Sequence, residues 1–200
     1  MRVQQGHSML QTIGIRGTDS GNGVTHLAIM LGNYLTAKLH KNTAILEMNH
    51  TNSFLELKES YVDNIKKNQG LNYFEISRVT YYYNIQSDKV GEIYSKEHEY
   101  IIIDMGNDNL KQINEFLKCN IKIVIGNLNP WKNKKFIHII ENYIACDNLE
   151  KVKYLVQFGL HDDVHQIEND YKICIYATPF EPDPFLIHGC NFEFFENLLH

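Results

Sequence analysis

Long hydrophobic runs are missing from this chain of 200 residues. No apolar stretch approaches the roughly 20 residues that a membrane-spanning helix needs, which excludes a transmembrane segment of ordinary composition. The first residues, MRVQQGHSMLQ, contain no continuous apolar core, so we expect no secretory signal. With 44% hydrophobic residues, the chain can still bury a core as one globular domain covering residues 1–200.

Cysteine is also sparse, with four residues and no CxxC pair. Cys119, Cys146, Cys174 and Cys190 each lie in or beside an apolar run, which favours buried free thiols over a disulfide framework or a zinc site. Free thiols are typical of a reducing compartment, so we expect the protein in the cytoplasm.

An excess of basic charge is absent as well, because the formal net charge is −5. This balance disfavours nucleic acid as a partner. The clearest basic cluster, Lys132, Lys134 and Lys135, is interpreted as a solvated helix face. We expect the neighbouring Trp131 to wedge between helix and sheet rather than to stand exposed as a partner anchor.

Short β-type runs alternate with helical stretches along the chain, a pattern typical of an α/β fold with a mostly parallel central sheet and helices on both faces. Residues 73–83 are rich in β-forming side chains and predict a strand pair or hairpin at the sheet margin. The other predicted strands are 12–16, 43–48, 100–104, 121–125, 152–157 and 173–176, and the predicted helices are 24–39, 130–143 and 191–199.

A glycine-rich loop joins the first predicted strand to the first helix. It runs from Gly17 to His26 and reads GTDSGNGVTH. Glycines permit positive φ, and successive backbone N–H groups at a helix start can bind phosphate. The plain phosphate-loop motif has four residues between its glycines and a Lys-Ser/Thr pair after them. Here five residues separate Gly17 from Gly23, and the pair is Val24-Thr25.

The loop resembles the deviant Walker A motif, K-G-G-x-G-K-[ST], of the ParA/MinD family of P-loop ATPases. Residues 19–25 occupy its seven places, with Gly21, Gly23 and Thr25 retained. Both lysines are replaced, the first by Asp19 and the second by Val24.

Three further segments extend the resemblance over roughly residues 11–186. ILEMNH (45–50) is similar to the second strand ending in D-x-D, with Glu47 and Asn49 in the acidic places. IIIDMG (101–106) resembles the Walker B strand, in which Asp104 would hold the magnesium shell. TPFEPDPF (178–185) resembles the loop that contacts adenine, which implicates Pro179 and Phe180.

The resemblance implies a vestigial or weak nucleotide site and, if Mg²⁺ binds, a metal site at Thr25 and Asp104. The alternative is that Asp104 serves only to cap the loop after its strand and that the glycines serve only the turn geometry. The implied nucleotide-binding residues are Gly17, Asp19, Ser20, Gly21, Asn22, Gly23, Val24, Thr25, His26, Pro179 and Phe180.

The two lost lysines weaken the expected chemistry. Loss of one charge-assisted hydrogen bond at Val24 costs about 1.5–3 kcal/mol, or roughly 10- to 150-fold in affinity. In the family, the lysine at the Asp19 place reaches the nucleotide of a partner subunit. A carboxylate about 4 Å from phosphate costs on the order of 4 kcal/mol. An ATP-bridged dimer is therefore disfavoured, while a homodimer without bridging ATP stays open.

We accordingly interpret the chain as a degenerate, non-catalytic member of this family, and the resemblance implies a bacterial source. It would serve as a binding or localisation module for partitioning, secretion or pilus machinery, with an unidentified protein partner and no certain cofactor. The alternative is a divergent switch or weak ATPase that binds ATP or ADP with Mg²⁺, with Arg16 as a substitute cation. A third hypothesis, a DNA-associated partitioning factor, requires a coherent basic surface around Lys132–Lys135.

Three other features are given structural interpretations. His26 and His50 flank the site and either hydrogen-bond an anion or have no role in binding. His161 and His165 are interpreted as surface residues, since no third metal ligand is evident. The terminal segment 190–200 carries glutamates instead of the basic residues of a membrane-binding tail, so we expect it to pack on the body.

Overall fold

The computed structural model describes residues 9–49, 51–61, 67–68, 70–85, 87–107, 113–146 and 152–200. Within these ranges nine strands form one sheet in the order β3-β4-β5-β2-β6-β1-β7-β8-β9. The strands are β1 (Gln11–Gly17), β2 (Thr43–Glu47), β3 (Lys67–Asn68), β4 (Leu71–Ile76), β5 (Val79–Tyr82), β6 (Tyr100–Asn107), β7 (Ile121–Gly126), β8 (Val152–Val156) and β9 (Ile175–Ala177).

The sheet is parallel from β5 across to β9 and antiparallel at its other margin. β4 and β5 form a hairpin whose two connecting residues, Ser77 and Arg78, have φ of 50° and 66°. Positive φ at both central residues is the conformation of a type I′ turn, which matches the twist of the two strands. The predicted hairpin at 73–83 and the predicted mostly parallel sheet are thus confirmed.

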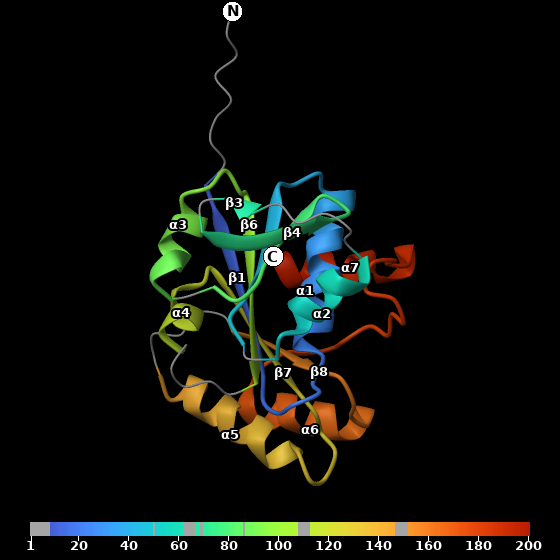
Figure 1. The fold of residues 1–200 in the computed structure, drawn as a ribbon. Helices are drawn as coiled ribbons and strands as arrows, with labels where there is room; N and C mark the ends of the chain where they lie inside the picture. The colour runs from blue at the N-terminus through green and yellow to red at the C-terminus, as the bar shows by residue number, and fades with distance from the viewer. Residues whose placement is uncertain are drawn as a thin grey trace, which may run out of the picture.

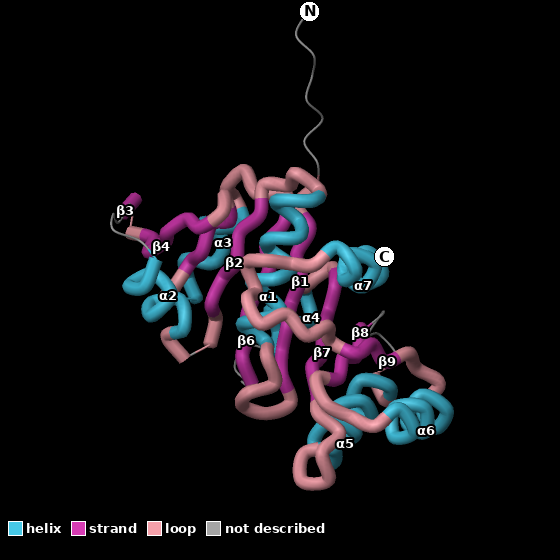
Figure 2. The backbone as a smooth tube through the Cα atoms, turned by 90° about the vertical axis from the view of Figure 1, so that its right-hand side faces the viewer, coloured by secondary structure: helices cyan, strands magenta, loops and turns pink. Residues whose placement is uncertain are grey.

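Helices cover both faces of the sheet, as Figures 1 and 2 show. One face packs against α1 (Val24–Asn33), α2 (Ser53–Tyr61) and α7 (Phe192–Leu199). The opposite face packs against α3 (Val90–Tyr94), α4 (Ile113–Lys118), α5 (Asn133–Ile144) and α6 (His161–Tyr171). The central strands between these layers are nearly continuous apolar runs, because their side chains are buried on both sides of the sheet.

Several predicted boundaries shift. The helix predicted at 24–39 is α1 followed by a π-helix, Tyr34–Lys38, in which the Leu39 N–H bonds the Tyr34 carbonyl at 3.4 Å. Pro130 does not open a helix as predicted, because a turn intervenes and α5 starts at Asn133. The last strand begins at Ile175 instead of residue 173, since the αL residue Lys172 ends α6 and the chain then needs two residues to reach the sheet.

The terminal helix α7 packs on the body of the domain, as predicted. Phe195 and Leu198 are fully buried, and the Phe195 ring stacks on Tyr34 with centroids 5.0 Å apart. Its apolar side is therefore covered by α1 and the π-helix. Among the described residues, no helix is long and apolar enough to cross a membrane.

Two predictions about burial are wrong. Cys119 is buried, but Cys146, Cys174 and Cys190 are exposed, because they lie just after α5, just before β9 and in the short 3-10 helix Gly189–Asn191. Trp131 is 76% exposed and does not wedge between helix and sheet. It lies in the turn after Pro130, before α5 begins, where no neighbouring layer covers it.

Candidate functional site: the loop between β1 and α1

The loop between β1 and α1 is attached to the neighbouring strand β7. The Thr18 N–H bonds the Ile125 carbonyl at 3.0 Å, and the Asn22 amide donates to the same carbonyl at 3.1 Å. Asn22 also donates to the Thr18 hydroxyl at 3.0 Å and is only 2% exposed. These bonds hold the loop over the carboxyl end of β7, where ligands of open parallel sheets bind.

Two glycines turn the chain into α1. Gly21 and Gly23 have φ of 77° and 76°, a region that residues with a Cβ rarely adopt. Gly23 is the N-cap of α1 and provides no side-chain cap, and the first turn carries no acidic residue. The unsatisfied N–H groups and the dipole of α1 therefore favour an anion at this position.

A cavity of about 310 Å³ lies at this helix start. Most of the predicted nucleotide-binding residues line it, together with three residues that the sequence did not indicate. Its lining residues are Asp19, Ser20, Gly21, Asn22, Gly23, Val24, Thr25, His26, Thr51, Gly106 and Asn107. Gly17, Pro179 and Phe180 are predicted site residues that do not line it.

The loop after β9 touches the site indirectly. Phe180 is 86% exposed. The neighbouring Glu181 carbonyl lies 2.8 Å from His26 Nε2, and because a carbonyl only accepts, His26 donates this bond. His26 therefore ties the start of α1 to the segment that resembles an adenine-binding loop. His50, the other histidine predicted to flank the site, lies outside the described residues.

Val24, in the place of the second lysine, is an apolar part of the cavity wall. The side chain is 6% exposed, and its Cγ2 atom lies 3.0 Å from where a Cβ on Gly17 would stand. Gly17 is thus required by the close packing of Val24 beneath the loop. No charge is available at this place to neutralise phosphate.

Asp19, in the place of the first lysine, is neutralised by a lysine 116 residues away. Lys135 Nζ lies 3.1 Å from Asp19 Oδ2, and the Ser20 N–H donates to Oδ1 at 2.9 Å. The hydrogen bond from Lys135, followed by that from Ser20, lowers the pKa of Asp19 below its ordinary value. Asp19 is therefore not the isolated carboxylate that we expected, because Lys135 places a positive charge beside it.

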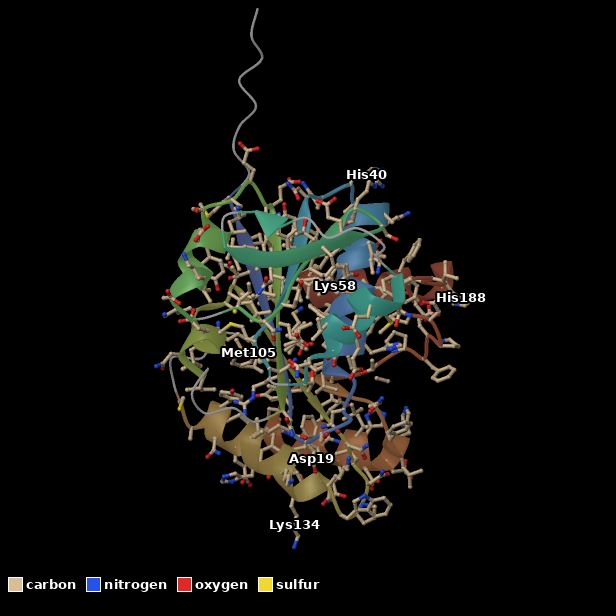
Figure 3. All side chains as sticks on the ribbon, in the orientation of Figure 1. Asp19, His40, Lys58, Met105, Lys134 and His188 are labelled. Atoms are coloured by element: carbon tan, nitrogen blue, oxygen red, sulfur yellow. The ribbon has the colours of Figure 1, made fainter. Side chains whose placement is uncertain are left out.

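The basic cluster 132–135 is consequently more than a solvated helix face. Lys132 Nζ donates to the Ser20 carbonyl at 3.3 Å, while Lys135 pairs with Asp19. Lys134 is exposed and projects away from the body, below Asp19 in Figure 3. The sequence signal for these contacts was the spacing of three residues between Lys132 and Lys135, which places both side chains on one side of the chain where α5 begins.

Arg16 is not the substitute cation that the alternative hypothesis needed. Its guanidinium donates to the Tyr143 hydroxyl at 2.8 Å and lies 5.8 Å from the centre of the Phe116 ring. Both partners belong to the helices α5 and α4, and Arg16 is 8% exposed. The side chain therefore points into the helical layer on the face opposite α1.

Asp104, at the end of the Walker B-like segment, is fully buried and engaged through both oxygens. The Thr25 hydroxyl donates to Oδ2 at 2.6 Å, and the Gly106 N–H donates to Oδ1 at 2.9 Å. Burial raises the pKa of Asp104 despite these hydrogen bonds. Thr25 and Asp104, predicted as magnesium ligands, are thus brought together and bonded to each other.

Glu47 is a second buried carboxylate, in register with Asp104 on the adjacent strand. Burial raises its pKa to about 7, and the charge of Asp104 adds to the effect. Its Oε1 accepts the Phe54 N–H at 3.2 Å and the Thr51 hydroxyl at 3.4 Å. The Thr51 N–H in turn bonds Asn49 Oδ1 at 2.9 Å. The acidic places of the second strand therefore hold the start of α2.

The backbone of the site is suited to the phosphates of Mg-ATP, but its charged side chains are not. The open start of α1 and the two αL glycines suit a phosphate group. Val24 supplies no cation, and Asp104, the carboxylate that the Thr25 hydroxyl contacts, already has both oxygens hydrogen-bonded. No hydrolytic step can be derived from these residues.

The arrangement of strands and helices around this loop is the fold of MinD and ParA-family ATPase structures. No family model matches the sequence, and no curated protein matches it in a sequence comparison. Three similar solved structures carry the assignment of the fold.

MinD of Aquifex aeolicus superposes with a TM-score of 0.65 at 16% identity, covering 94% of this chain and 86% of that one. A plasmid partition protein of Borrelia burgdorferi B31, solved with AMPPNP, gives 0.67 at 13% identity, covering 95% and 96%. A ParA family ATPase of Chlorobium tepidum TLS gives 0.62 at 10% identity, covering 88% and 87%. At such identities the likeness establishes the fold alone.

Proposed function

We propose that this chain is a non-catalytic protein with the MinD/ParA fold that acts as a binding or localisation module. The observation that carries the proposal is the buried valine at the place of the second lysine. Val24 packs against Gly17 and puts an apolar side chain in the cavity lining where the lysine would stand. Stabilisation of charge on a transferred phosphoryl group is the main task of such a site, and here it is missing.

Exposed apolar side chains around the loop support a protein partner. Trp131, Phe158 and Phe180 are 76%, 57% and 86% exposed. Each belongs to a loop at the carboxyl edge of the sheet. The loop of Trp131 is hydrogen-bonded to the β1–α1 loop through Lys132 and Ser20, and the loop of Phe180 is hydrogen-bonded to α1 through His26. Exposed aromatic side chains gathered near one edge are typical of interaction surfaces.

Solved proteins of this fold offer a precedent for the kind of partner. One Aquifex aeolicus MinD structure is a complex with MinC, and the Borrelia burgdorferi structure is a plasmid partition protein. We therefore propose a role in positioning bacterial partitioning, secretion or pilus machinery, in the cytoplasm. Free thiols at Cys119, Cys146, Cys174 and Cys190 agree with a reducing compartment.

The test is calorimetric titration with Mg-ATP and Mg-ADP to several millimolar. We expect no saturable heat from the natural protein, and binding by the Val24→Lys, Asp19→Lys double variant. Val24→Ala is the matched control, since it removes the buried valine without adding a cation, and a thermal melt checks that each variant folds. Saturable binding and hydrolysis by the natural protein would refute the proposal.

A second candidate function, weak binding of a phosphate-bearing ligand, is favoured by two lysines that are hydrogen-bonded to residues of the cavity lining. Lys132 and Lys135 already contact Ser20 and Asp19, so a short rearrangement would bring one ammonium group to an anion at the start of α1. If the natural protein binds Mg-ATP, this function requires Lys135→Ala to weaken binding roughly 10-fold or more. Lys134→Ala, whose side chain points away, is the matched control.

A further inference from the structure

Two histidines on α6 converge at a point outside the loop site. His161 and His165 are four residues apart, so they share one side of the first turns of this helix. Their Nε2 atoms lie 3.2 Å apart, with ring centroids 4.1 Å apart and planes at 73°. Both residues are exposed.

A half-buried glutamate, Glu168, orients the second histidine. His165 Nδ1 lies 3.0 Å from Glu168 Oε2, and Glu168 Oε1 accepts the Ile175 N–H at 2.8 Å. Glu168 is thus held between the helix and strand β9. A carboxylate only accepts, so His165 Nδ1 carries the proton and donates it. In neutral His165 the lone pair is therefore on Nε2, which faces His161.

In metal sites, histidine ligands are oriented in the same way, by a carboxylate that accepts from the ring nitrogen that does not bind the metal. The distance between the two nitrogens fits a shared ion. With metal–nitrogen bonds of about 2.0–2.1 Å, two ligands separated by 90° to 109° lie about 2.9–3.4 Å apart, and the observed distance is 3.2 Å.

We propose that His161 and His165 bind a divalent transition metal ion of the class that prefers imidazole, namely Zn²⁺, Ni²⁺ or Cu²⁺. Both Nε2 atoms are the ligands, and Glu168 is the positioning residue that fixes the tautomer of His165. Because both ligands are exposed and come from one helix, the remaining coordination positions face solvent. They can accept water or a side chain of another protein.

Within the described residues, no group of three or more histidine, cysteine, aspartate or glutamate side chains forms a closed metal site. The pair is therefore an open, two-ligand site and not a structural zinc centre, which has four ligands. It lies on α6, apart from the lining of the loop cavity.

Calorimetry with Ni²⁺ on the untagged full chain tests the proposal, after the exposed Cys146, Cys174 and Cys190 are alkylated to remove competing thiolates. Histidine ligation to Ni²⁺ also gives a visible absorption band as a second readout. We expect one ion per chain, with at least 10-fold weaker binding by His161→Ala and by His165→Ala. The matched control is His138→Ala. His138 is an exposed histidine of α5 without a histidine four residues away, because Lys134 and Asn142 occupy those positions.

Glu168→Gln separates ligation from mere surface proximity. The glutamine oxygen can still accept the Ile175 N–H, but its amide faces His165 Nδ1 and forces the proton onto Nε2, toward the metal. We expect about 10- to 100-fold weaker Ni²⁺ binding with an unchanged circular dichroism spectrum. Equal affinity of the natural protein, His161→Ala and His165→Ala would overturn the proposal, as would no saturable binding at 1 mM Ni²⁺. Either result would leave the pair as a histidine–histidine hydrogen bond.

Discussion

Glu47 is expected to make the stability of the protein fall as the pH rises through a defined window. Its pKa is raised from an ordinary value of 4.5 to about 7 by burial beside Asp104. Between these two values the unfolded chain has lost the Glu47 proton and the folded chain has kept it. The unfolded state then binds fewer protons, so the free energy of unfolding decreases with increasing pH.

The shift sets the size of the effect. A difference of 2.5 pKa units, from 4.5 to about 7, corresponds to about 3 kcal/mol. This contribution is intact below pH 4.5 and fully lost above pH 7. Glu47→Gln keeps an oxygen to accept the Phe54 N–H and removes the titration. The free energy of unfolding of the variant minus that of the natural protein should therefore be up to about 3 kcal/mol larger at pH 7.5 than at pH 4.5.

Urea unfolding at several pH values between 4.5 and 7.5 measures this difference. Subtracting the stability curve of the variant from that of the natural protein cancels every group that titrates alike in both. Asp104 also has a raised pKa, so its titration likewise lowers the free energy of unfolding as the pH rises. Glu59→Gln, at an exposed position of α2, is the matched control and should leave the curve unchanged. If the curves of the natural protein and Glu47→Gln stay parallel over this range, the reasoning from burial is wrong.

Three further predictions concern packing and exposure. Phe195→Ala should lower the free energy of unfolding by about 3–5 kcal/mol, because this ring is fully buried under Tyr34. Phe194→Ala should lower it less, since Phe194 is only partly buried, and urea denaturation of the two variants compares the losses. Gly126→Ala should cost about 1–3 kcal/mol, since a Cβ there would collide with the Phe136 ring, and an unchanged midpoint would contradict this. Trp131, the one tryptophan, should emit at the wavelength of solvated indole and shift to the blue when a partner covers it, while Trp131→Ala should change stability by less than about 0.5 kcal/mol.

The sequence predicted the fold because its local signals agree with its global pattern. The strands β1, β2, β6 and β7 are apolar runs that only a sheet covered on both faces can bury. The hairpin of β4 and β5 was evident from its tyrosines and β-branched residues, and the terminal helix from its phenylalanines.

The site was only partly predictable, because its decisive contacts join distant parts of the chain. The glycines and Thr25 could be placed from motif spacing, but the pairing of Asp19 with Lys135 depends on where α5 ends up relative to β1. The direction of Arg16 could not be read either, since a residue at a strand end can face either layer. Trp131 was misjudged because hydrophobicity alone does not tell a turn residue from a core residue.

The central position of β1 has a consequence for how the chain acquires its structure. Gln11 of β1 pairs with Tyr100 of β6, and on the other edge Ile13 pairs with Ile121 of β7. At a synthesis rate of about 5–20 residues per second, β1 leaves the ribosome roughly 5 to 20 seconds before its first partner exists. Its apolar residues, including Ile13 and Ile15, must remain unpaired during that time. The nascent amino-terminal half should therefore be the stretch most dependent on chaperones, whereas the β4–β5 hairpin can form as soon as it is made.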